Sequence, residues 1–207
     1  MGALTVGSNG TLFGATQYGG RVNKACRVGC GTVFSLAPPE VSGGTWTAKI
    51  LYAFNPEIGD GWDPWTGLVI SPTTGVLYGT TYAGGSAGFG TVFSVNPPAI
   101  PGEPMTETTL YSFTESDGSS FSSLVLGPNG ALYGTTHGGP GNGGTVFELA
   151  PPASPGGSWT KTVLHSFPSG TGGYYPNALT LGPDGILYGT TYVGGTWDVG
   201  TVYSLTP

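Results

Sequence analysis

A five-residue motif, Leu-Tyr-Gly-Thr-Thr, recurs along the chain and constrains its fold more than any other feature. It occupies Leu77–Thr81, Leu132–Thr136 and Leu187–Thr191, and in a weaker form, Leu-Phe-Gly-Ala-Thr, Leu12–Thr16. The last three copies lie 55 residues apart, and the first precedes the second by 65. Recurrence at a period of this length is typical of repeat architectures, in which each repeat is one supersecondary unit.

Each copy of the motif lies between the same kinds of segment, so each repeat is predicted to have four strands. The third repeat ends with a fourth strand predicted over 159–167. The first, second and third strands of the last repeat are then predicted over 178–181, 186–192 and 201–205. Turn signals such as Asp184-Gly185 join the first two strands as a hairpin. The fourth strand, which ends in aromatic-x-Phe at Phe54, Phe113 and Phe167, occurs only three times. The last repeat is therefore expected to lack its outer strand.

The predicted strands lack a polar face, which indicates that both faces of each sheet are covered. No segment shows a 3.6-residue apolar pattern of helical length. Four-stranded sheets that pack face to face around an axis cover both faces, and the central Gly of the motif lets a neighbouring sheet approach closely. We therefore predict an all-β fold, a single β-propeller over residues 1–207 with repeats at 3–66, 67–122, 123–177 and 178–207. The repeats would form a four-bladed ring, half of an eight-bladed dimeric ring, or part of a longer array.

Charge and hydropathy exclude two classes of partner. The net charge is −6 with only five Lys and Arg residues, which argues against nucleic acid. No apolar run reaches the roughly 18–20 residues of a membrane helix, so no membrane span is expected. The first residues also lack the basic and apolar regions of a signal peptide.

The two cysteines, Cys26 and Cys30, lie in the loop that lengthens the first repeat. A zinc site usually needs four ligands, and no second cysteine pair exists. We therefore predict a local disulfide between Cys26 and Cys30, with a pair of free thiols as the alternative. A disulfide would fit an oxidising, extracellular location.

The candidate binding residues lie in one set of loops. One set of loops joins the fourth strand of a repeat to the first strand of the next, and a second set joins the second strand of a repeat to its third. Both sets emerge on the same face of a blade, and their sequences differ between repeats. Loops on a rigid scaffold are where binding groups concentrate. The candidate ligand-binding residues are aromatic: Trp62, Trp65, Phe121, Tyr174, Tyr175 and Trp197. Structural interpretations stay open: the tryptophans would cover blade edges, and Asp60 and Asp117, each followed by Gly, would form turns.

The whole pattern, Leu-Tyr-Gly-Thr-Thr-x-x-Gly-Gly followed by Gly-Thr-Val-Phe, Pro-Pro and Val-Leu-Tyr-Ser-Phe, is similar to the Gloeo/Verruco (GloVer) tandem repeat of bacterial exported proteins. The Asp-Gly-x-Leu-Tyr hairpin also resembles NHL and gluconolactonase-like propeller blades. The first resemblance covers nearly the whole chain and implies an extracellular or surface-anchored protein, without an established activity.

Two functions are expected from these observations. The first is an extracellular binding or surface-structural module for a small molecule or glycan, because aromatic rings stack on sugars and Asp and Asn bond to hydroxyls. The second, which the gluconolactonase resemblance implies, is a metal-dependent hydrolase of the lactonase or phosphotriesterase type. A divalent cation (Ca²⁺, Mn²⁺ or Zn²⁺) near the axis would then activate water. Its candidate ligands are Asp60, Asp63, Asp117, His137 and Asp198, although His137 also replaces a Tyr of other repeats and fits a packing role.

Overall fold

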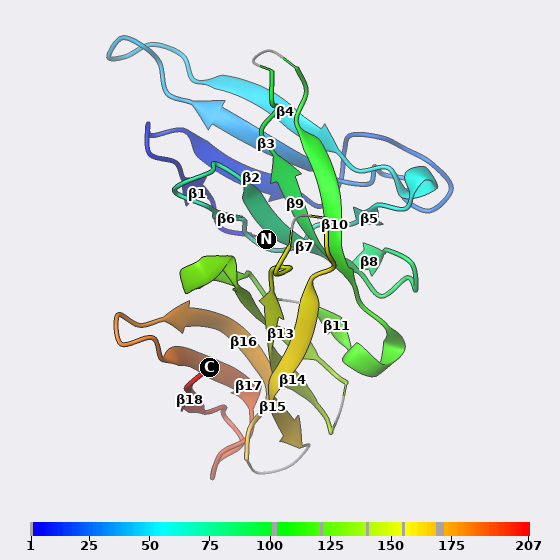
Figure 1. The fold of residues 1–207 in the computed structure, drawn as a ribbon, viewed down its shortest axis with the longest axis vertical. Coiled ribbons are helices and arrows are strands. Elements are labelled where there is room, and N and C mark those ends of the chain that lie inside the picture. Colours follow the sequence, from blue (N-terminus) through cyan, green and yellow to red (C-terminus); the bar gives the residue numbers. More distant parts are fainter. Residues whose placement is uncertain (1, 101–102, 121, 140, 155, 169–171) are drawn as a thin grey trace.

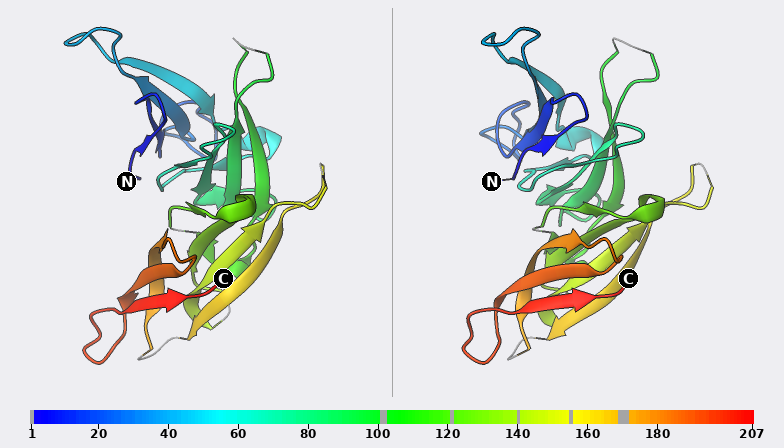
Figure 2. Two further views of the ribbon diagram at one scale, coloured as in Figure 1. Left: turned by 60° about the vertical axis from the view of Figure 1, so that its left-hand side comes forward. Right: turned by 90° about the vertical axis from the view of Figure 1, so that its left-hand side faces the viewer.

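The computed structural model describes residues 2–100, 103–120, 122–139, 141–154, 156–168 and 172–207, and its strands form four antiparallel blades around one axis (Figures 1 and 2). Helical structure in these residues is limited to three single turns: η1 (Pro56–Ile58), η2 (Glu115–Asp117) and η3 (Pro128–Gly130). The predicted all-β, four-bladed propeller arrangement is confirmed.

Each blade contains one copy of the recurring motif, and its strands pair in chain order except in the third blade, where two short strands both pair with the motif strand. The first blade contains β1 (Thr5–Val6), β2 (Leu12–Thr16), β3 (Thr32–Ala37) and β4 (Thr47–Ala53). The second contains β6 (Val69–Ile70), β7 (Leu77–Thr81), β9 (Thr91–Asn96) and β10 (Thr106–Ser112). The third contains β11 (Ser119–Ser120), β12 (Val125–Leu126), β13 (Leu132–His137), β14 (Asn142–Ala150) and β15 (Thr160–Pro168). Among the described residues, the fourth contains β16 (Tyr174–Leu181), β17 (Leu187–Val193) and β18 (Val202–Leu205) without an outer strand, as predicted.

The recurring motif forms the second strand of every blade and is tied to the third strand by a pair of threonines. The hydroxyl of its last residue bonds to the hydroxyl of the Thr in the following Gly-Thr-Val segment, at 2.8–2.9 Å in all four blades: Thr16–Thr32, Thr81–Thr91, Thr136–Thr145 and Thr191–Thr201. The middle Gly is needed for packing, because a Cβ on Gly134 would come within 2.7 Å of the Phe147 ring. The motif is therefore explained by the architecture of the blade.

Neighbouring blades pack through one aromatic contact that repeats along the chain. The Phe at the end of each outer segment, inside β15 in the third blade and directly after β4 and β10 in the first two, meets the ring on the third strand of the next blade edge-on. The ring centroids are 5.0 Å apart for Phe54–Phe93, 5.7 Å for Phe113–Phe147 and 5.0 Å for Phe167–Tyr203. These contacts form the centres of the three buried clusters, each of which spans two blades.

The two end blades each have one face without such a neighbour. Val33, Val92 and Val146 are fully buried on the third strands of the first three blades, whereas Val202, at the same place in β18, is 81% exposed. At the other end, the ring of Phe34 is partly exposed, although the matching Phe93 and Phe147 are fully buried. In the part of the chain that the structure describes, no helix has the length and apolar character to cross a bilayer.

Candidate functional site

The loops that were predicted to share one face are joined to each other by short strands. β5 (Gly61–Trp62) lies between the first and second blades, and it pairs with β8 (Ala83–Gly84) in the loop that follows β7. β11 pairs in the same way with the end of β13. Because these loops are hydrogen-bonded into small sheets, the side chains on this face are held on rigid backbone.

A groove of about 630 Å³ lies on the open face of the first blade. It is lined by Leu4, Gly14, Phe34 and Trp65 among others. In the next blade, the equivalents of Leu4, Gly14 and Phe34 pack together, and Phe54 of the preceding blade covers the ring. The groove thus has the composition of a surface on which two blades pack. No aromatic ring of the described residues covers Phe34 in the way that Phe54 covers Phe93.

A second cavity, the axial pocket, has a different character. Its volume is about 230 Å³. It is lined by residues that precede or lie in the innermost strands of all four blades, and by His137 at the end of β13: Gly2, Ala3, Trp65, Thr66, Ser122, Ser123, His137, Asn177 and Ala178. None of these described residues carries a carboxylate, ammonium or guanidinium group. The pocket therefore offers neutral hydroxyl, amide and imidazole groups beside one indole ring.

The polar groups of the axial pocket are oriented by hydrogen bonds to neighbouring strands. The Thr66 and Thr80 hydroxyls are 2.9 Å apart, and the Ser122 hydroxyl accepts from the backbone N–H of Thr135 at 2.9 Å. The Asn177 amide donates to Thr190 at 3.3 Å. These three residues occupy the same position in successive repeats, so the pocket is built from matching elements.

Trp65 breaks this repetition. Three residues separate Pro64 from Leu68, whereas two separate Pro176 from Leu179 in the matching loop between the third and fourth blades. The additional residue is Trp65, whose side chain is 47% exposed and lines both the axial pocket and the groove on the first blade. A single-residue insertion thus brings an accessible indole to the rim of the axial pocket.

His137 and Tyr175 form an aromatic pair next to the axis. The His137 Nε2–H donates to the Pro176 carbonyl at 3.2 Å, and the two ring centroids are 5.3 Å apart. Burial lowers the pKa of the imidazole, and the bond to the carbonyl only partly opposes this effect. His137 is therefore a neutral hydrogen-bonding group at pH 7. Tyr175 adopts a positive φ of 56°, which turns the chain sharply at this loop.

Three other predicted aromatic residues, Trp62, Tyr174 and Trp197, do not line the axial pocket. Trp62 borders a separate pocket of about 250 Å³ beside the disulfide loop. Tyr174 packs edge-on against Tyr175 with ring centroids 5.0 Å apart. Trp197 is 83% exposed on the loop after β17, and Phe121 lies outside the described residues. The structure thus places Trp65 and His137 at the axial pocket and Tyr175 beside His137, whereas Trp62 and Trp197 do not line the pocket.

Asp60 and Asp117 occupy equivalent turns, and their carboxylates are taken up by protein donors. Asp60 is 6% exposed and accepts from the Tyr52 hydroxyl at 2.5 Å and the Asn55 N–H at 2.9 Å. Asp117 accepts from the Tyr111 hydroxyl at 3.0 Å and the Thr114 N–H at 2.8 Å. Burial and the Asp117 carboxylate together raise the pKa of Tyr111 to about 12. Both aspartates therefore fit the turn-forming role that was the structural alternative in the sequence analysis.

The remaining carboxylates of the predicted metal set also lie apart. Asp198 accepts from the Gly194 N–H at 2.9 Å within a tight turn. Asp63 has a buried Oδ1 without a hydrogen-bond partner among the described residues, and burial raises its pKa, against the effect of a bond from Gln17. No three His, Cys, Asp or Glu side chains of the described residues are grouped as metal ligands would be. These residues therefore do not fit a shared cation site.

Two partly buried charged residues between blades were not predicted from the sequence. Glu107 on β10 and Lys161 on β15 occupy the same register position, opposite Val95 and Leu149. Lys161 Nζ reaches back to Asp117 Oδ1 at 2.7 Å, and its side chain is 6% exposed. Burial, together with the neighbouring charge of Asp60, raises the pKa of Glu107 to about 7. The repeat alignment could have found this position, since it carries Ala48 in the first blade and opposite charges in the next two.

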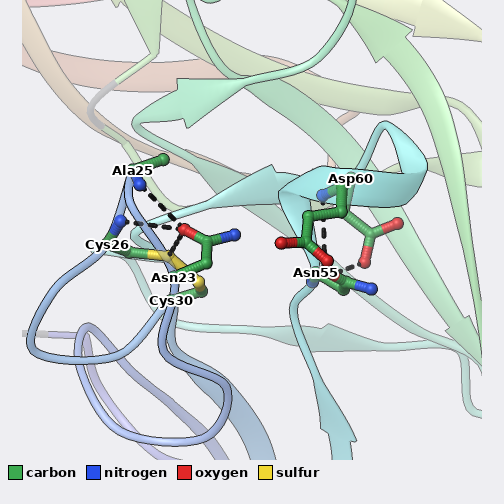
Figure 3. The surroundings of a disulfide bond; sticks show 7 residues. Asn23, Ala25, Cys26, Cys30, Asn55 and Asp60 are labelled. Atoms are coloured by element: carbon green, nitrogen blue, oxygen red, sulfur yellow. Dashed lines mark hydrogen bonds between the residues drawn. A yellow bond between two sulfur atoms is a disulfide. The ribbon is translucent and has the colours of Figure 1, made fainter.

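The structure joins Cys26 and Cys30 in a disulfide with Cα atoms 5.0 Å apart, inside the long loop of the first repeat (Figure 3). The Asn23 side-chain oxygen caps this loop by accepting from the N–H of Ala25 at 2.8 Å and of Cys26 at 3.2 Å. The Cys30 carbonyl accepts from the Asp63 N–H at 3.0 Å, so the loop is also tied to the connection between the first two blades.

Removal of this disulfide should cost only about 2 kcal/mol of unfolding free energy, because the bond closes a loop of few residues and constrains the unfolded chain little. The measurement is urea unfolding of the Cys26→Ser/Cys30→Ser variant beside the oxidised protein. Loss of cooperative unfolding in the variant would contradict this expectation and would make the disulfide essential for the first blade.

Comparison with known proteins adds a family and a fold. The model of the Gloeobacter/Verrucomicrobia repeat matches residues 1–203. Comparison with curated proteins gives no match. A crystal structure from the Northeast Structural Genomics Consortium, provisionally designated a gluconolactonase, aligns with a TM-score of 0.52 and 20% identity over 98% of this chain. The chain spans 57% of the length of that protein, and at this identity the likeness concerns the fold alone.

Proposed function

This protein belongs to the Gloeobacter/Verrucomicrobia repeat family, and we propose that it is an extracellular binding module that takes one sugar ring of a glycan, or a similar polyhydroxylated molecule, in its axial pocket. The observation that carries the proposal is the neutral polar lining of that pocket beside the half-exposed indole of Trp65. An extracellular location is supported by the disulfide, since such bonds persist in oxidising compartments.

The chemistry of the pocket fits a sugar better than an ionic ligand. Hydroxyl and amide groups of Ser123 and Asn177 can exchange hydrogen bonds with sugar hydroxyls, and an aromatic face stacks on the apolar face of the ring. A volume of about 230 Å³ lies below the roughly 300–1,000 Å³ of sites for drug-sized ligands. We infer that a single ring enters the pocket while the rest of the glycan remains in solvent.

Replacement of Trp65 by alanine should weaken binding at least tenfold, or by about 1.4 kcal/mol, because the stacking surface is lost. The ligand is to be found on a glycan array with the labelled wild-type protein, and the affinity for the bound monosaccharide or oligosaccharide is then measured by titration calorimetry. Trp197→Ala is the matched control, since it removes an even more exposed indole that does not line the axial pocket. Equal affinities of the two variants, or an array without any bound glycan, would contradict the proposal.

The second candidate, a metal-dependent hydrolase of the lactonase type, is tested separately. It requires a cation bound to carboxylates, and the carboxylates of Asp60 and Asp117 accept hydrogen bonds from tyrosine and backbone groups instead. Elemental analysis of the purified protein for calcium, manganese and zinc distinguishes the two functions, together with lactone hydrolysis before and after chelation. Stoichiometric metal and chelator-sensitive hydrolysis would favour the enzyme.

A further inference from the structure

We infer that the open edge of β18 is a docking site for a strand that ends in aromatic-x-Phe, supplied by a further repeat of the same family. In the first three blades the third strand pairs with an outer strand: β3 with β4, β9 with β10 and β14 with β15. Within the described residues, β18 pairs with β17 alone. Its outer edge thus presents the backbone groups that the other third strands use for pairing.

The exposed side chains of β18 indicate what should cover it. Val33, Val92 and Val146 each belong to a buried cluster that contains the Phe of their own blade's outer segment: Phe54, Phe113 and Phe167 respectively. Val202 has the equivalent position and is 81% exposed. An outer strand with a terminal Phe would therefore bury Val202 as its three counterparts are buried.

The groove on the first blade also indicates that a Phe from an outer strand is the missing contact, here at the opposite end of the molecule. Phe93, Phe147 and Tyr203 each receive the edge of a Phe at the end of an outer segment. Phe34 is the fourth ring in this series, and it lines the 630 Å³ groove. The fourth blade thus presents one side of the interblade contact at β18, and the first blade presents the complementary side at Phe34.

A second copy of the described residues does not supply the strand. Its outer strands β4, β10 and β15 are each paired within a blade, and Phe54, Phe113 and Phe167 are buried. A ring of two copies, one of the arrangements predicted from the sequence, would leave β18 of each copy without a fourth strand from these residues. The docked segment is therefore an additional strand of this kind, which adds to the sheet by backbone hydrogen bonds and is selected by its aromatic residue.

The test uses a fluorescein-labelled peptide with the sequence of residues 105–113, Met-Thr-Glu-Thr-Thr-Leu-Tyr-Ser-Phe, added to the intact protein. We expect saturable binding in fluorescence anisotropy and slower hydrogen exchange of the β18 amides. The Phe113→Ala peptide should bind at least tenfold more weakly. Absence of binding by the parent peptide, or equal binding of both peptides, overturns the inference.

Protein variants localise the binding to β18. Val202→Asp should abolish peptide binding because it would bury a carboxylate against the Phe, whereas Val199→Asp should have no effect. The two valines are equally exposed at 81%, so neither substitution should disturb the free protein. Binding that survives Val202→Asp would assign the peptide to another surface, such as the groove at Phe34. A dimer in light scattering that protects β18 without peptide would assign the edge to a second copy; either result overturns the inference.

Discussion

Replacement of Asp117 by alanine should lower the free energy of unfolding by about 3–5 kcal/mol, because it leaves a buried ammonium group without its counterion. Lys161 pairs with Asp117 at 2.7 Å, and the exposed fractions of the two side chains are 6% and 14%. The ammonium nitrogen also lies 5.7 Å from the ring centroids of Tyr111 and Phe147, so the aromatic seam between the second and third blades surrounds it. The measurement is equilibrium unfolding in urea, followed by tryptophan fluorescence.

The double variant Asp117→Ala/Lys161→Met separates the charge effect from the loss of hydrogen bonds at the turn. Methionine fills the space of the lysine stem without a charge, so the double variant should be more stable than Asp117→Ala by at least about 1 kcal/mol. Strictly additive losses for the two substitutions would show that the ion pair and the buried ammonium do not determine the effect.

The interface between the first two blades should respond to pH through Glu107. The folded protein keeps the Glu107 proton up to a pKa of about 7, because the group is buried and faces the Asp60 carboxylate, whereas the ordinary value is 4.5. The folded state thus binds more protons between these values, and the free energy of unfolding falls as pH rises through this window. For a fully buried group, a pKa shift of this size would change the free energy of unfolding by about 3 kcal/mol. Glu107 is partly exposed, so we expect the free energy of unfolding to change by about 2 kcal/mol.

Unfolding curves between pH 4 and 8 for the wild type and for Glu107→Gln check this expectation. The amide cannot ionise, so the difference between the two proteins should grow as pH rises and level off above pH 7. Glu40→Gln, on an exposed connection between β3 and β4, is the control and should follow the wild type. If Glu107→Gln followed the wild type as well, the group would already be ionised in the folded protein at low pH.

The blades could be predicted from the sequence because their signals are local. The Leu-Tyr-Gly-Thr-Thr motif, the turn residues and the Gly-Thr-Val segment each act within one hairpin, and their order alone indicated four strands per repeat and a missing outer strand in the last. The turn at Asn129 and Gly130 illustrates this: both residues adopt positive φ, 61° and 79°, as the Asn-Gly pair implies.

The candidate site was harder to predict because it depends on contacts between repeats. The role of Asp117 is determined by Lys161, a residue of the next blade, and the sequence spacing of the two gives no sign of their contact. The axial pocket combines pairs of neighbouring residues from four separate parts of the chain with His137, and most of these residues are small and belong to no recognisable motif. Trp65 was noticed as an aromatic residue, but its position beside the axis follows from one inserted residue, which only a comparison of the loops in three dimensions makes visible.

The nearly sequential pairing of strands has a consequence for how the protein forms. Apart from the short ladder between β11 and β13, every ladder within a blade joins strands of that blade that follow each other in the chain, and the paired threonine hydroxyls tie the second strand of a blade to its third within 16 residues or fewer. Closing such short loops costs little chain entropy. A blade can therefore assemble as soon as its own residues have left the ribosome, and each finished blade then offers its aromatic face as a template for the next. The order of synthesis and the order of assembly coincide, so beyond the open face of the first blade the growing chain exposes one unfinished apolar face, on the blade made last.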